Sequence, residues 1–131
     1  MTPQTMRIAG HRGHSAGAPE NTMAAFRLAR ELGGTGVTCE TDLSMTSDGE
    51  FVLIHDETVD RTTNWHGLVR NMTYAEIAAL DAGSWFDAKF AGERIPRLRD
   101  ALLYARDAGI IYQLELKIYD QNDVIFPKLR A

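Results

Sequence analysis

The feature that most constrains the fold is an alternation of short apolar strands with amphipathic helices. We predict strands at residues 6–10, 36–43, 51–55 and 110–118, and helices at 22–32, 73–80 and 96–109. Such alternation is typical of parallel strands joined by crossover helices. One connection differs, because the turn at residues 47–50 (SDGE) has Asp-Gly at its centre and predicts a hairpin. The sequence therefore predicts an α/β fold.

The two longer helices are each expected to bury one face. Their apolar positions recur at helical spacing. These positions are Ala25, Phe26, Ala29 and Leu32 in the first helix, and Leu98, Ala101, Leu102 and Ala105 in the other. Asn21 fits the start of the first helix, and Gly109 fits the end of the second.

Polar side chains come late in the predicted strands. They are His11, Arg12, Glu40, Asp42, His55, Glu115 and Lys117. Residues two apart in a strand share a face, so Glu40 and Asp42 point the same way, while Cys39 and Leu43 point the other way. In parallel α/β folds, binding and catalytic sites are built at the carboxyl ends of the strands.

Each of these residues also has a plain structural explanation. A Glu-x-Asp or Glu-x-Lys pattern usually faces solvent, and a histidine at a strand end is usually a surface or core residue. Arg12 fits an ordinary surface arginine, and Asp56 fits a turn or cap. His14 and His66 lie in loops and are given no role. Taken together, however, the buried charges would be costly unless they share a site.

The three carboxylates, Glu40, Asp42 and Glu115, can converge on one cation. Because they offer only oxygen ligands, they favour Mg²⁺ or Ca²⁺ over zinc. Cys39 faces away from them, which argues against a thiolate ligand.

The remaining polar residues fit phosphate chemistry. The cations Arg12 and Lys117 suit the non-bridging oxygens of a phosphate. His11 and His55 can act as an acid–base pair near neutral pH. This combination describes a phosphodiesterase better than an esterase, because the sequence has no G-x-S-x-G elbow and no P-loop.

Length, composition and charge limit the number of domains, the kinds of partner and the expected location of the protein. The chain has 131 residues, enough for one domain, and a net charge of −4, which argues against nucleic-acid binding. No apolar run reaches the roughly 18 to 20 residues of a membrane span. The start lacks the layout of a signal peptide. The single cysteine, Cys39, cannot form an internal disulfide, so a cytoplasmic location is the expectation.

The sequence resembles the bacterial glycerophosphodiester phosphodiesterases. The matching segments are AGHRGHSAGAPENTMAAF, CETDLSMTSDGEFVLIHDETVDRTT, LDAGSWFDAKFAGERIPRLRDAL and LELK. Each is weakly specific alone, but their order and spacing match the family across nearly all of residues 6–118. The resemblance implies the N-terminal portion of a (β/α)₈ barrel that is truncated in this chain, with a small insertion at roughly residues 57–94 after the second strand region.

The resemblance also implies an activity, namely the metal-dependent hydrolysis of glycerophosphodiesters to glycerol 3-phosphate and an alcohol. By position, His11 and His55 would be the acid–base pair, and Arg12 and Lys117 the phosphate contacts. The metal ligands would be Glu40, Asp42 and Glu115. In the family mechanism the neighbouring glycerol hydroxyl attacks phosphorus, and water then opens the cyclic phosphate. Glu20, in the PENT segment, would either hold the site in place or simply start a helix.

Two alternative functions and three explanations of the chain's length remain open. The same residues would serve a lysophospholipase D-like enzyme, which would need a long apolar groove. The chain could instead be inactive and serve only as a binding or assembly module. Such barrels run to roughly 250 residues, so the open sheet would associate with a second copy or a partner chain, or the chain would be a truncated product.

Overall fold

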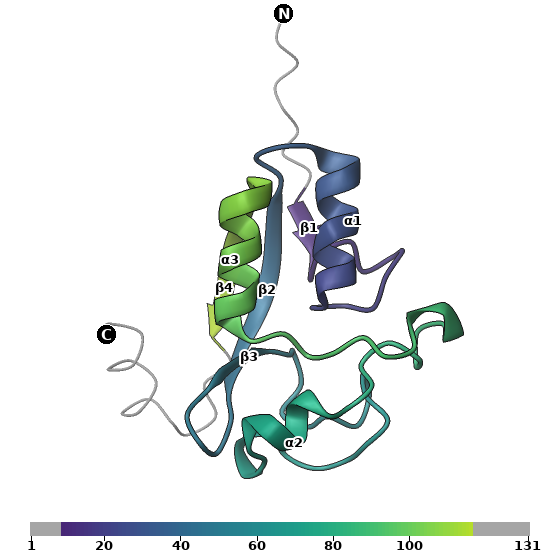
Figure 1. The fold of residues 1–131 in the computed structure, drawn as a ribbon, viewed down its shortest axis with the longest axis vertical. Coiled ribbons are helices and arrows are strands. Elements are labelled where there is room, and N and C mark those ends of the chain that lie inside the picture. The colour runs from purple at the N-terminus through teal and green to yellow at the C-terminus, as the bar shows by residue number, and fades with distance from the viewer. Residues whose placement is uncertain (1–8, 117–131) are drawn as a thin grey trace, which may run out of the picture.

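The elements of the computed structural model, which describes residues 9–116, follow the predicted order (Figure 1). They are β1 (Ala9–His11), α1 (Met23–Gly33), β2 (Thr38–Met45), β3 (Phe51–Leu53), η1 (Val69–Asn71), α2 (Tyr74–Ala78), η2 (Ala88–Phe90), α3 (Leu98–Ala108) and β4 (Ile111–Leu116). Every predicted helix and strand is present, with ends shifted by a few residues. The predicted first and last strands extend in part outside the described residues.

β2 is the central strand of the sheet. It pairs in parallel with β1, from Ala9–Thr38 to His11–Glu40, and with β4, from Thr38–Ile111 to Leu43–Leu116. It pairs antiparallel with β3, which confirms the predicted hairpin. Residues 38–40 of β2 pair with both β1 and β4, and Leu43 pairs with both β3 and β4. Because a strand has two edges, β4 occupies one edge of β2, and β1 and β3 share the other. Within residues 9–116 the sheet stays open.

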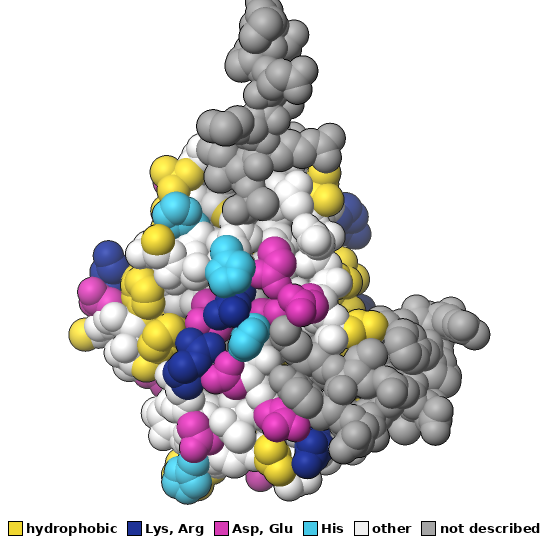
Figure 2. Space-filling model, turned by 180° about the vertical axis from the view of Figure 1, so that it is seen from behind, with side chains coloured by type: hydrophobic (Ala, Val, Ile, Leu, Met, Phe, Trp, Pro, Cys, Tyr) yellow, Lys and Arg dark blue, Asp and Glu magenta, His cyan; other side chains and the backbone are white. Residues whose placement is uncertain are grey.

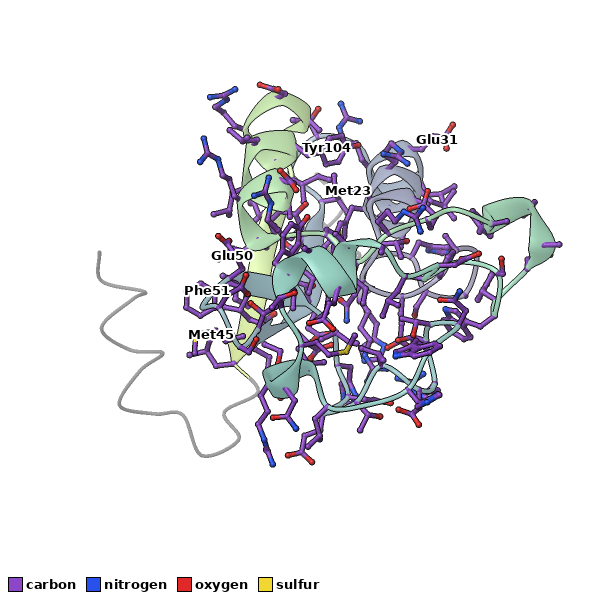
Figure 3. The ribbon with its side chains drawn as sticks, turned by 60° about the horizontal axis from the view of Figure 1, so that its bottom comes forward. Met23, Glu31, Met45, Glu50, Phe51 and Tyr104 are labelled. Carbon is purple, nitrogen blue, oxygen red and sulfur yellow. The ribbon has the colours of Figure 1, made fainter. Side chains whose placement is uncertain are left out.

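The two long helices cover one face of this sheet (Figure 1). The core beneath them contains Phe26, Ala29, Val37, Cys39, Leu43, Leu53, Ala101 and Ile110. Met23 of α1 and Tyr104 of α3 lie between the two helices and pack against this core (Figure 3). The burial of Cys39 and Leu43 confirms the predicted apolar face of β2.

Two leucines on the predicted buried helix faces, Leu32 and Leu102, are exposed, and so is Leu114 of β4. Leu32 is 61% exposed, Leu102 is 48% and Leu114 is 40%. Leu32 lies in the last turn of α1, and Leu102 lies beside the contact face that Ala101 and Ala105 form. Periodicity tells which residues share a face, but it does not tell how far the neighbouring element extends over that face.

The segment between β3 and α3 forms a second apolar cluster together with Val52 of β3. Its buried members are Val52, Ile54, Val59, Val69, Met72, Ile77, Leu80, Ala82 and Ile95. The short helix predicted at 73–80 is α2, which begins in a capping box where Thr73 and Glu76 bond each other's backbone N–H. The segment lies near the end of the sheet where β1 and β2 finish (Figure 1). No helix of the described part is long and apolar enough to cross a membrane.

Candidate active site

The three predicted metal-ligating carboxylates come together on neighbouring strands. Glu40 and Asp42 lie two apart on β2, and Asp42 is paired in register with Glu115 of β4. Each side chain offers an oxygen within 4.8 Å of the others. This spread is within the roughly 4.6–5.2 Å that separates opposite oxygen ligands of Ca²⁺, while the smaller Mg²⁺ would draw opposite oxygens to about 4.0–4.2 Å. The donor set therefore fits a hard divalent cation.

Burial makes this carboxylate group costly without a cation. Asp42 is 1% exposed. Oε2 of Glu40 is buried and has no hydrogen-bond partner among residues 9–116. Burial, followed by the negative charge of Asp42, raises the pKa of Glu40 above its ordinary value. A bound cation would offset both effects, because it stabilises the ionised carboxylates.

Cys39 is placed as predicted, on the opposite face from the carboxylates. Its side chain is fully buried in the core beneath the helices. Burial raises the pKa of its thiol to about 11, so the thiolate that a metal would need is not formed near neutral pH.

Asn21 fixes the carboxylate of Asp42, a contact that the sequence did not reveal. Its amide nitrogen donates to Oδ2 of Asp42 at 3.0 Å, and its amide oxygen accepts from the Thr41 hydroxyl at 2.7 Å. Its backbone N–H donates to the carbonyl of Arg12 at 2.9 Å. The residue has a left-handed backbone (φ 58°), which asparagine tolerates better than most residues. The predicted helix start is wrong by one position, because Thr22 is the N-cap of α1.

Replacing Asn21 by alanine should lower the free energy of unfolding by about 2–3 kcal/mol. The change removes two buried hydrogen bonds and places alanine in a left-handed conformation. Urea denaturation measures the loss. Asn71→Ala, at an exposed position, is the matched control and should change stability by less than about 0.5 kcal/mol. Equal effects of the two changes would contradict the role given to Asn21.

His11 and Arg12 lie at the end of β1, beside the carboxylates. Nε2 of His11 is 3.7 Å from Oε2 of Glu40, and the ring is largely exposed. The chain turns sharply here, with left-handed backbone at Arg12 and Gly13. A Cβ on Gly13 would lie 2.7 Å from the Cβ of Ala25, so only glycine fits against α1.

Arg12 is held between two acidic side chains. Its Nε lies 3.4 Å from Oδ2 of Asp42, and its Nη1 lies 3.3 Å from Oε2 of Glu20. The plain explanation of Arg12 as a surface arginine is therefore wrong. Glu20 does not cap the helix, but contacts Arg12 and also Arg61. Lys117, the other predicted phosphate contact, lies outside the described residues.

His55 follows β3 and bonds its neighbour Asp56. Nδ1 of His55 is 2.7 Å from Oδ1 of Asp56. The hydrogen bonds from Arg61 are the main reason that the pKa of Asp56 falls to about 2, and the bond to His55 lowers it further. An ionised carboxylate only accepts hydrogen bonds, so Nδ1 carries the proton and the lone pair of the neutral ring is on Nε2. Asp56 lies in the predicted turn, but it also orients His55.

Histidine, arginine and acidic side chains gather at the centre of the face seen from the side opposite to Figure 1 (Figure 2). Most of the side chains in this network were predicted from their positions at the ends of the strands. The bond from Asn21 to Asp42 and the contacts of Arg61 were not predicted. The only local signal for Arg61 was its position within the segment DETVDRTT, which directly follows His55.

The open α/β sheet and its cluster of carboxylates and histidines define a class of protein, the α/β proteins that build their site at the carboxyl ends of parallel strands. Residues 11–125 match the model of the glycerophosphoryl diester phosphodiesterase family. This chain belongs to that family.

Individual relatives agree with this assignment. A glycerophosphodiester phosphodiesterase of Caldanaerobacter subterraneus is 50% identical over 110 residues, which are 84% of this chain and 44% of the relative. A crystal structure of the enzyme from Agrobacterium tumefaciens has a TM-score of 0.79 at 44% identity and covers 90% of this chain and 50% of that one. An Oleispira antarctica phosphodiesterase, solved with the product sn-glycerol-3-phosphate, has a TM-score of 0.78 at 39% identity, covering 83% and 43%.

These comparisons confirm the predicted fold class, the N-terminal portion of a (β/α)₈ barrel. The matched region is 44% of the length of the curated relative at 50% identity and 45% of the length of another at 46% identity, so this chain spans slightly less than half of each.

Proposed function

We propose that this chain carries the catalytic constellation for metal-dependent hydrolysis of glycerophosphodiesters to glycerol 3-phosphate and an alcohol. The observation that carries the proposal is the convergence of Glu40, Asp42 and Glu115 within 4.8 Å, in a chain of this family. The relative solved with sn-glycerol-3-phosphate supports glycerol 3-phosphate as the product class.

The three carboxylates would hold Mg²⁺ or Ca²⁺. The buried Oε2 of Glu40, which has no hydrogen-bond partner in the described part, supports a cation at this position. When bound, the cation supplies positive charge that offsets the charge developing on the phosphoryl oxygens. Asn21 keeps the carboxylate of Asp42 turned toward this position through its 3.0 Å hydrogen bond.

The cationic side chains would orient the phosphodiester. A guanidinium has five N–H donors in a fixed plane, so Arg12 can contact Glu20 and Asp42 and still offer donors to a phosphate oxygen. Lys117, two residues beyond Glu115, would provide the second phosphate contact. Both cations would attract the diester and fix its phosphorus near the acidic group.

The two histidines would move the protons. One ring accepts the proton of the glycerol hydroxyl as its oxygen bonds to phosphorus, and the other donates a proton to the departing alcohol oxygen. Water then opens the cyclic phosphate with the proton transfers reversed. His55 suits this task because its bond to Asp56 fixes the tautomer, with the lone pair of the neutral ring on Nε2. Either histidine can take either role.

The test is choline release from glycerophosphocholine by purified chain, measured on size-exclusion fractions of known mass. We expect release with Mg²⁺ or Ca²⁺, and none after EDTA. The mass of the active fraction shows whether a second copy is needed. Exposed apolar side chains suited to such association are Leu102, Leu103, Ile111 and Leu114. A folded fraction that binds the cation but releases no alcohol from glycerophosphocholine or glycerophosphoethanolamine would contradict the proposal. Turnover of lysophosphatidylcholine alone would point to the lysophospholipase D-like reaction instead.

A further inference from the structure

Arg61 lies in an exposed loop, but its side chain bonds two carboxylates beside the candidate site. It lies in the segment between β3 and α3, and its side chain is about half exposed. Yet its guanidinium makes four hydrogen bonds to two carboxylates. Nη1 and Nη2 donate to the two oxygens of Glu20 at 2.8 and 2.9 Å. Nε and Nη2 donate to the two oxygens of Asp56 at 2.9 and 3.0 Å.

These contacts join two segments that are far apart in the sequence. Glu20 precedes α1, whereas Asp56 follows β3. Each partner of Arg61 in turn contacts a residue of the candidate site, because Glu20 lies 3.3 Å from Arg12 and Asp56 lies 2.7 Å from His55. A continuous line of ion pairs and hydrogen bonds therefore runs from Asp42 through Arg12, Glu20, Arg61 and Asp56 to His55.

The loop that carries Arg61 is anchored by the core of its own segment. Val59 is fully buried in that core, and its N–H donates to the carbonyl of Gly67 at 3.0 Å. Thr63 bonds the carbonyl of Val59 through its hydroxyl at 2.6 Å and through its N–H at 3.1 Å. The backbone on both sides of Arg61 is therefore fixed, and the guanidinium is held at the end of a short, supported turn.

We propose that Arg61 is a positioning residue that sets the orientation of His55 through Asp56, and that couples this histidine to Arg12 through Glu20. Without the guanidinium, two carboxylates would face each other with no cation between them, and Asp56 would rotate away from the His55 ring. Lysine cannot replace it fully, because an ammonium group is a point charge and cannot donate in a fixed fork to two carboxylates at once. The effect on turnover rests on the proposed function, whereas the effect on the His55 ring does not.

The test combines ¹⁵N NMR of the neutral His55 ring with steady-state kinetics. In the unaltered chain we expect the Nδ1–H form of the neutral ring to dominate. In Arg61→Ala we expect a shift toward the Nε2–H form and a kcat about 10- to 100-fold lower, the range typical for loss of a group that orients a site residue. Arg61→Lys should restore less than half of the tautomer shift. Arg70→Ala is the matched control, since within residues 9–116 the ion-pair partner of Arg70 is Glu57 of the same segment, at 3.2 Å, and it should change neither quantity.

The outcomes separate this inference from the proposed function. A chain without phosphodiesterase activity, in which Arg61→Ala still shifts the His55 tautomer, would contradict the proposed function and support the positioning role. An unchanged tautomer in Arg61→Ala would overturn the positioning role, whatever the activity. If Arg61→Ala does not fold, Arg61→Lys decides alone, and a His55 tautomer identical to that of the unaltered chain would overturn the proposal.

Discussion

The double change Glu40→Gln and Asp42→Asn is expected to weaken Mg²⁺ and Ca²⁺ binding by at least about 100-fold. Losing a group that merely supports a metal ligand already costs about 10- to 100-fold in affinity, and here two of three carboxylates are removed. The amides keep the shape of the side chains but lose the charge that holds a hard cation. Isothermal titration calorimetry on the purified chain measures the change, with circular dichroism to show that the variant is folded.

The matched control removes two carboxylates of the same types from the surface. Glu31 of α1 and Asp107 of α3 are exposed, so Glu31→Gln with Asp107→Asn changes the net charge equally without touching the acidic group. We expect cation affinity to stay within about twofold of the unaltered chain, because exposed charges at a distance are screened by salt. If the control and the site variant lost affinity equally, the cation would not be bound by Glu40 and Asp42.

Replacing either His11 or His55 by alanine is expected to lower kcat for glycerophosphocholine by about 10² to 10⁴, the usual contribution of a positioned acid or base. Neither histidine is among the three ligands of the acidic group, so cation affinity should change little. The measurement pairs choline release, in the active size-exclusion fraction, with calorimetric titration of the cation. This pairing separates loss of proton transfer from loss of the metal site.

His66→Ala is the control for the histidine variants. His66 is exposed and stacks on Trp65, with ring centroids 4.7 Å apart. Within residues 9–116 it makes no contact with the acidic group. Its loss should leave turnover unchanged. A kcat that falls less than about threefold in both His11→Ala and His55→Ala would contradict the assignment of the acid–base pair.

Local patterns predicted the elements and the faces of the strands. Alternation along β2 placed Glu40 and Asp42 together and Cys39 opposite them, because side chains of a strand alternate by simple geometry. The Asp-Gly turn predicted the hairpin of β2 and β3 for the same kind of local reason. These features need only residues that are neighbours along the chain.

Contacts between distant loops could not be predicted in this way. Asn21 fitted a helix start by residue type, and nothing in its neighbourhood indicated that it would bond Asp42. Arg61 and Glu20 are 41 positions apart and meet only because α1 and the segment after β3 lie against the same end of the sheet. The exposure of Leu114 likewise depends on which elements cover β4, which its own sequence does not encode.

The measurement that tests the site most directly is the location of bound Mn²⁺, a cation that prefers the same oxygen ligands and broadens nearby NMR signals. Nε2 of His11 lies 3.7 Å from Glu40, so its ring signals should broaden strongly at less than one equivalent of Mn²⁺ and return after EDTA. The same titration of the Glu40→Gln, Asp42→Asn variant should leave these signals sharp. His11 signals that stay sharp at one equivalent in the unaltered chain, or that broaden equally in the variant, would contradict a cation held by these carboxylates.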